Sequence, residues 1–120
     1  MSLRNVDLPT LRAALWTARA LHQARRELRG GAVEDVVLLE PPKLPDTAER
    51  GVWALLRRRE HTCLERALVL QRWEAAHGRP REVVIGVSSS RPEFHAHAWL
   101  EGDPDNDGEV FHELMRLPAR

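Results

Sequence analysis

Apolar residues recur at intervals of three and four over the first sixty positions, which predicts two helices. The first helix begins after Asp7, whose side chain can cap it, and ends at the glycine pair 30–31. The second helix opens at Asp46, where Glu49 three residues later completes a capping pattern. The intervening segment 33–39 fits either a strand or a helix, and both interpretations stay open.

A central helix is predicted in the string that starts at His61 and stops before Gly78. Thr62 stands where an N-cap belongs, and Glu65 three residues later completes a capping box. Apolar side chains occupy more than one face of this segment, which indicates a largely buried helix.

The hydrophobic period changes to two beyond residue 80, which predicts strands. Three strands are expected, at residues 82–87, 94–101 and 109–113, arranged as an antiparallel meander. Helices followed by strands define an α+β fold, with N-terminal helices and a central helix packed on a small antiparallel sheet. One tryptophan falls in each main element, which predicts a shared core for Trp16, Trp53, Trp73 and Trp99.

Length and charge narrow the class of protein. The 120 residues fit one domain, 1–120, with a helical N-terminal part at 1–60 and a core at 61–113. Lys plus Arg equals Asp plus Glu at 18 each, so neither a nucleic acid nor a membrane is indicated as partner. The single cysteine excludes an internal disulfide, and no segment resembles a signal or a membrane span. We therefore expect a cytoplasmic protein.

Cys63 is the first candidate for chemistry, because the predicted capping box places it in the first turn of the central helix. The positive end of the helix dipole stabilises a thiolate there. The same turn holds backbone N–H groups that can bind the oxyanion of a tetrahedral intermediate. The competing interpretation is a small buried cysteine that only fills the core.

A histidine-bearing strand follows in the sequence. Alternation puts His95 and His97 on one face of this strand, and Ala98 and Leu100 on the other. If the alanine face packs away from the central helix, both histidines point toward Cys63, where an imidazole can take the thiol proton. In the competing interpretation this face of the strand is exposed to solvent, and the histidines are only surface residues.

Two metal sites are weaker alternatives. Cys63 with His95, His97 and His61 would supply a set of zinc ligands, but the usual close cysteine pair is missing. The turn at 103–108 mimics the first half of a calcium loop, yet it lacks the bidentate glutamate at position twelve. We expect neither a bound metal nor a cofactor, and no P-loop motif for ATP is present.

Three strings together resemble a known family: His61-Thr-Cys-Leu-Glu-Arg-Ala-Leu-Val-Leu-Gln-Arg-Trp73, Val84-Ile-Gly-Val87 and Ala96-His-Ala-Trp-Leu-Glu101. They are similar to the transglutaminase-like, papain-like leader peptidases of lasso-peptide biosynthesis, the microcin-processing type. The resemblance implies a cysteine protease that removes the leader from a ribosomally made precursor. It also implies two partners, a separate leader-recognition protein and an ATP-using lasso cyclase.

By position, the resemblance implies that Cys63 is the nucleophile and His97 its base. His61 would support the oxyanion, and His95 would line the cleft. The family places an aspartate on the strand after the histidine, but here that place belongs to Glu113. Asp107 and Asp105 are therefore kept as alternative orienting acids.

Two other functions stay open. The departure at the acid position is compatible with a non-catalytic member that binds peptide and scaffolds the cyclase. Transglutaminases carry the same residues, so acyl transfer to an amine is the remaining alternative.

Overall fold

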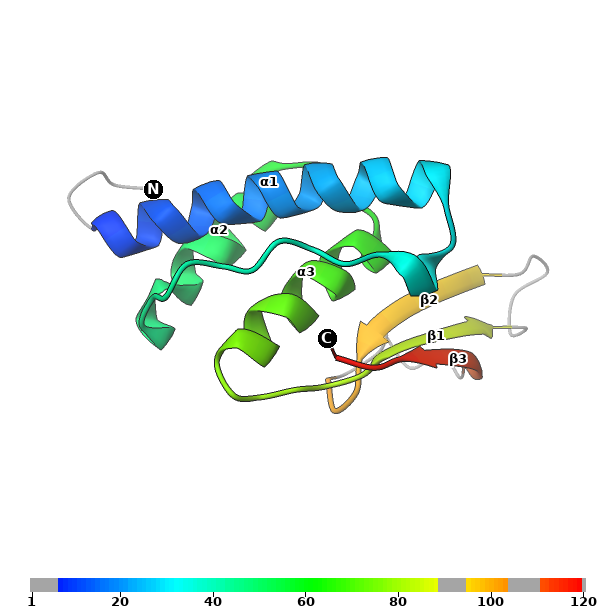
Figure 1. Cartoon of the computed structure of the whole chain (residues 1–120). Helices are drawn as coiled ribbons and strands as arrows, with labels where there is room; N and C mark the ends of the chain where they lie inside the picture. Colours follow the sequence, from blue (N-terminus) through cyan, green and yellow to red (C-terminus); the bar gives the residue numbers. More distant parts are fainter. Residues whose placement is uncertain (1–6, 89–94, 104–110, 120) are drawn as a thin grey trace. The chain divides into compact units, whose positions relative to one another are not determined.

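Three helices and three strands lie in the ranges that the computed structural model describes, residues 7–88, 95–103 and 111–119 (Figure 1). The chain forms two compact units, Met1–His61 and Thr62–Arg120. The predicted α+β class is confirmed, since unit 1 is helical and unit 2 holds a helix and the sheet. The assignment of the whole chain to one peptidase domain stays a prediction.

Helix α1 (Leu8–Gly30) begins and ends as predicted. The Asp7 carboxylate accepts a hydrogen bond of 2.9 Å from the backbone N–H of Thr10, so Asp7 is the N-cap. Pro9 fits the first turn because its missing N–H would have no acceptor within the helix. At the other end the chain becomes extended at Gly31.

The segment 33–39 was expected to be either a strand or a helix, and it is neither. A single 3-10 turn, η2 (Val33–Asp35), leads into extended chain that follows α1. The Gln23 side chain takes the place of a partner strand: it accepts from the Leu39 N–H at 2.8 Å and donates to the Val37 carbonyl at 3.0 Å. Backbone groups that a sheet would pair are thus satisfied by one side chain.

Helix α2 (Glu49–Arg58) does not begin with the predicted cap. A 3-10 turn, η3 (Asp46–Ala48), occupies the expected first turn, and Ala48 is the N-cap without a side-chain bond. Gly51 lies against the backbone of α1, where an added Cβ would come within 3.0 Å of the Thr10 carbonyl group. Tertiary contact with α1 therefore positions α2.

Helix α3 (Cys63–Ala76) confirms the predicted capping box. The Glu65 N–H donates to Thr62 Oγ1 at 3.0 Å, and the Thr62 N–H donates to Glu65 Oε1 at 3.0 Å. Trp73 is fully buried in α3, as the apolar pattern predicts, whereas Trp53 in α2 is exposed. The expectation that all four tryptophans share one core is wrong.

The sheet contains β1 (Val83–Ser88), β2 (His95–Leu100) and β3 (His112–Leu117) in the order β2-β1-β3, all antiparallel. The predicted meander is wrong, because β3 pairs with β1 instead of β2.

Strand β3 also runs farther than predicted, from His112 to Leu117, because Met115 and the buried Leu117 continue the inward alternation. Residues 94, 109 and 110 of the predicted strands lie outside the described residues. Opposite the Ile85–Gly86 step of β1, Leu114 has no partner and forms a bulge.

The core of unit 2 combines α3 with one face of the sheet. In the cross-strand register, Val83 lies opposite both Leu100 and Leu117, and all three side chains are buried. The Gln71 side chain of α3 donates to the Leu117 carbonyl at 2.8 Å, which fastens the end of β3 to the helix.

Candidate active site

Cys63 occupies the first position of α3, as the sequence predicts, and its side chain is half-buried. The capping box uses the N–H groups of Thr62 and Glu65. The N–H groups of Cys63 and Leu64, in contrast, have no acceptor among the described residues, as expected for a first helical turn. Two backbone donors therefore flank the sulfur and are available to an oxyanion.

His97 lies in the middle of β2, directly opposite Gly86 of β1. Its ring packs beside those of Trp99 and Phe111, with centroid distances of 5.6 and 5.4 Å. Ala98 is only 3% exposed and shares its face with the buried Leu100, so the alanine face packs toward α3 and the half-buried His97 projects from the opposite face of the sheet. The expectation that this face packs away from the central helix is therefore wrong.

The N-terminus of α3 and the first half of β2 lie toward the same end of unit 2. Helix α3 returns to β1 through residues 77–82, so its C-terminal end meets the start of β1 and the finish of β2 (Figure 1). A 14-residue helix spans about 21 Å and a six-residue strand about 20 Å. The Cys63 thiol has no hydrogen bond among the described residues, so its pairing with His97 stays a prediction.

Glu113 lies in the same cross-strand row as His97, with Gly86 between them. Two strand spacings separate the backbones, about 10 Å. The carboxylate of Glu113 accepts from Nε of Arg116 at 2.8 Å, and this bond holds the pKa of Glu113 below its usual value. The role of Glu113 toward His97 stays a prediction.

Sequence reasoning missed the role of Arg116, which gathers three carboxylates at the end of the sheet. Besides Glu113, its guanidinium lies 3.0 Å from Glu101 and 3.3 Å from Glu82. These hydrogen bonds raise the pKa of Arg116 above its usual value. The signal was hidden because the predicted third strand stopped before Arg116.

Two further predicted site residues, His61 and His95, lie within the described residues. The Nδ1–H of His61 donates to the Arg59 carbonyl at 2.9 Å, since a carbonyl oxygen can only accept. His95 opens β2 opposite Ser88. Asp105 and Asp107 lie outside the described residues.

Within the described ranges, no group of three or more His, Cys, Asp or Glu side chains is placed to hold a metal ion. None of the helices there is long and apolar enough to cross a bilayer.

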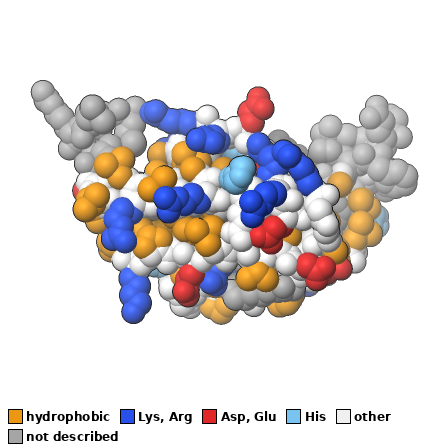
Figure 2. All heavy atoms as spheres, turned by 45° about the horizontal axis from the view of Figure 1, so that its top comes forward, with side chains coloured by type: hydrophobic (Ala, Val, Ile, Leu, Met, Phe, Trp, Pro, Cys, Tyr) orange, Lys and Arg blue, Asp and Glu red, His pale blue; other side chains and the backbone are white. Residues whose placement is uncertain are grey.

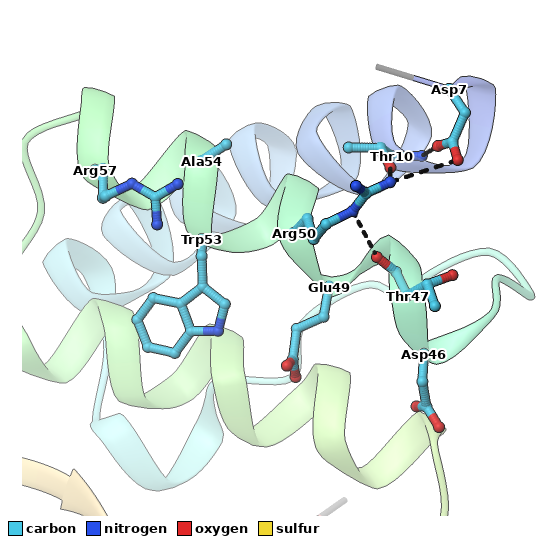
Figure 3. Close-up of a pocket in the computed structure, with 9 residues that line it drawn as sticks. All are labelled: Asp7, Thr10, Asp46, Thr47, Glu49, Arg50, Trp53, Ala54 and Arg57. Atoms are coloured by element: carbon cyan, nitrogen blue, oxygen red, sulfur yellow. Dashed lines mark hydrogen bonds and ion pairs between the residues drawn. The ribbon is translucent and has the colours of Figure 1, made fainter. Parts of the chain in front are cut away.

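A pocket of about 970 Å³ in unit 1 was not predicted from the sequence. Figure 3 shows its walls, in which the exposed Trp53 and Arg57 come from α2. Arg50 lies at the opposite end, 3.6 Å from the Asp7 carboxylate, and donates to the Thr47 carbonyl. Both acidic and basic side chains line the pocket, so it favours neither an anionic nor a cationic ligand.

Comparison with known proteins identifies a family that covers nearly the whole chain. The family model described as the transglutaminase-like superfamily matches residues 5–115. Searches of curated proteins and of solved structures returned no significant match.

Proposed function

Because the chain belongs to the transglutaminase-like superfamily, which includes cysteine peptidases and acyltransferases, we propose that it is a cysteine peptidase. The observation that carries the proposal is the capping box, which sets Cys63 beside two unused backbone N–H groups at the start of α3. This is the arrangement that a thiolate nucleophile and its oxyanion require.

In the proposed reaction, His97 takes the proton of the Cys63 thiol, and the thiolate attacks the scissile carbonyl carbon. The N–H groups of Cys63 and Leu64 hold the oxyanion. His97 then gives its proton to the leaving amine, which departs and leaves a thioester on Cys63. Water attacks the thioester with His97 as base, releasing the new carboxylate and the free thiol.

We propose that the substrate is the precursor of a lasso peptide, cut at the junction of leader and core. This finer assignment rests on the sequence resemblance in the three strings around Cys63, Gly86 and His97. The released core would pass to a lasso cyclase, and a separate leader-recognition protein would present the precursor. The reaction would take place in the cytoplasm.

Two residues are candidates for the acid that orients His97. Glu113 is placed in the row of His97, but its carboxylate is engaged by Arg116. A catalytic role therefore requires the carboxylate to exchange Arg116 for the imidazole. Asp107 is the alternative.

Cleavage of a cognate precursor by purified protein, with the leader-recognition protein supplied, tests the assignment. We expect Cys63→Ala to abolish product formation while circular dichroism stays unchanged, and His97→Ala to reduce the rate by at least 100-fold. Full activity of Cys63→Ala would refute the proposed cysteine peptidase activity. Normal cleavage by Glu113→Gln together with loss in Asp107→Asn would transfer the orienting role to Asp107.

Acyl transfer is the second candidate, and membership of the superfamily favours it. Mass spectrometry of the products separates the two reactions, because hydrolysis yields a free carboxylate and transfer yields an amide. Because Arg116 engages the Glu113 carboxylate, a non-catalytic scaffold is a third candidate. A Cys63 thiol that resists iodoacetamide at neutral pH would favour the scaffold, since an activated cysteine alkylates quickly.

A further inference from the structure

The exposed face of α1 combines leucines with arginines. Leu8, Leu11 and Leu15 are 69%, 52% and 53% exposed, and their spacing of three and four places them on one side of the helix. Arg12 and Arg19 are exposed on the same side. Figure 2 shows hydrophobic and basic side chains interleaved on the face of the molecule that it presents. We define the α1 face as these five residues.

Helix α1 carries a strong excess of positive charge. The helix carries five arginines and one acidic residue, Glu27, although the whole chain is neutral. Glu27 is engaged by the Gln23 amide at 2.7 Å. Within the part of the chain that the structure describes, neither Arg12 nor Arg19 forms an ion pair. The α1 face therefore offers guanidinium groups that are open to carboxylates.

A hollow of about 290 Å³ borders this face at Arg12, Leu15 and Arg19. Leu15 and Trp16 of α1 line it together with Leu39 and Pro42 of the extended segment. This volume lies near the lower end of the usual range for ligand pockets, about 300 Å³, and suits one large apolar side chain.

The wall of the hollow is held in place by specific bonds. The Trp16 indole N–H donates to the Leu39 carbonyl at 3.1 Å, and the Gln23 side chain holds the Leu39 N–H. Arg12 and Arg19 line the hollow with Glu40, so the positive charges exceed the negative charge there. An apolar anchor set between arginines is the usual anatomy of a protein interface.

We propose that the α1 face binds an acidic, amphipathic segment of a partner protein. One apolar side chain of the segment enters the hollow, others cover Leu8 and Leu11, and its carboxylates pair with Arg12 and Arg19. Three separately exposed leucines and a preformed hollow favour a protein over a nucleic acid, which would need only the arginines. The inference does not depend on the peptidase activity proposed above.

Fluorescence anisotropy with the full chain and three labelled synthetic helical peptides of equal length tests the proposal. The first carries leucines at spacings of three and four with flanking glutamates, the second has lysine for each glutamate, and the third has serine for each leucine. We expect the glutamate–leucine peptide to bind at least tenfold more tightly than either of the others. Equal binding by the serine peptide would overturn the proposal, because it would leave only charge attraction.

Variants of the protein locate the binding surface. Arg12→Glu with Arg19→Glu, and separately Leu11→Ser with Leu15→Ser, should each weaken binding of the first peptide at least tenfold. Arg57→Glu with Arg58→Glu makes the same charge change on exposed residues of α2 and should alter binding less than twofold. An equal loss in that control would refute the α1 face as the site.

The leucine variants keep the test decisive if the charge-reversed pair fails to fold, and circular dichroism checks each protein. Duplex DNA and phosphatidylserine vesicles are measured in parallel. Tighter binding to either than to the glutamate–leucine peptide would contradict a protein segment as the occupant.

Discussion

The two shorter helices, α2 and α3, begin in different ways. Helix α2 follows a 3-10 turn, has no side-chain cap, and is positioned where Gly51 meets the backbone of α1. Helix α3 begins with reciprocal bonds between Thr62 and Glu65. The start of α2 therefore depends on distant packing, whereas the start of α3 is fixed by its own residues. The position of Cys63, the proposed nucleophile, is therefore maintained by local bonds.

The largest effect is expected where α2 depends on α1. Gly51→Ala would push a methyl group into the Thr10 carbonyl and should destabilise the protein by about 3 kcal/mol. Urea unfolding followed by tryptophan fluorescence measures this. Gly30→Ala is the matched control, because no atom lies within 4 Å of its added Cβ. Equal stability of both variants would show that α2 does not depend on this contact.

Removing the local cap of α3 should have an intermediate effect. Thr62→Ala deletes the acceptor of the Glu65 N–H and should cost about 1 kcal/mol in the same urea experiment. An unchanged midpoint would mean that tertiary packing, rather than the capping box, fixes the first turn around Cys63.

The corresponding position before α2 should tolerate the same change. Asp46→Ala removes no cap from α2, so the free energy of unfolding should change by less than about 0.5 kcal/mol. A loss equal to that of Thr62→Ala would remove the distinction between the two helix starts.

The smallest effect is expected at the start of α1, where the stability contributed by the Asp7 cap depends on pH. Hydrogen bonds from Thr10 hold the pKa of Asp7 below its usual value. This cap therefore stabilises the folded chain above the ordinary aspartate range, and the stabilisation is lost as the pH falls through the lowered pKa. Asp7→Asn caps without titrating and should flatten the decline of stability between about pH 5 and pH 2, measured by urea unfolding. Thr62→Ala should retain the decline of the wild type.

Local signals explain what the sequence predicted well. Asp7 and the glycine pair 30–31 set the two ends of α1, and the Thr62–Glu65 box sets the start of α3. Each of these signals acts on backbone groups only a few residues away in the sequence. The start of α2 was mispredicted because Asp46 has a capping side chain while Gly51 decides the placement from its contact with α1.

Long-range pairing explains what the sequence could not supply. The order β2-β1-β3 depends on which edge β3 reaches, and no local residue encodes that choice. The site shows the same division. The place of Cys63 in the first turn of α3 was predicted from adjacent residues, whereas the row of His97 and Glu113 across Gly86 required the strand register.

The bulge at Leu114 has a consequence for solubility. Strand β3 is an edge of the sheet, and an edge with regular spacing invites the strands of other molecules to add to it. Leu114, 64% exposed and opposite no residue of β1, interrupts that spacing. The irregular spacing thus hinders strand addition at the β3 edge, even though that edge presents a leucine to water.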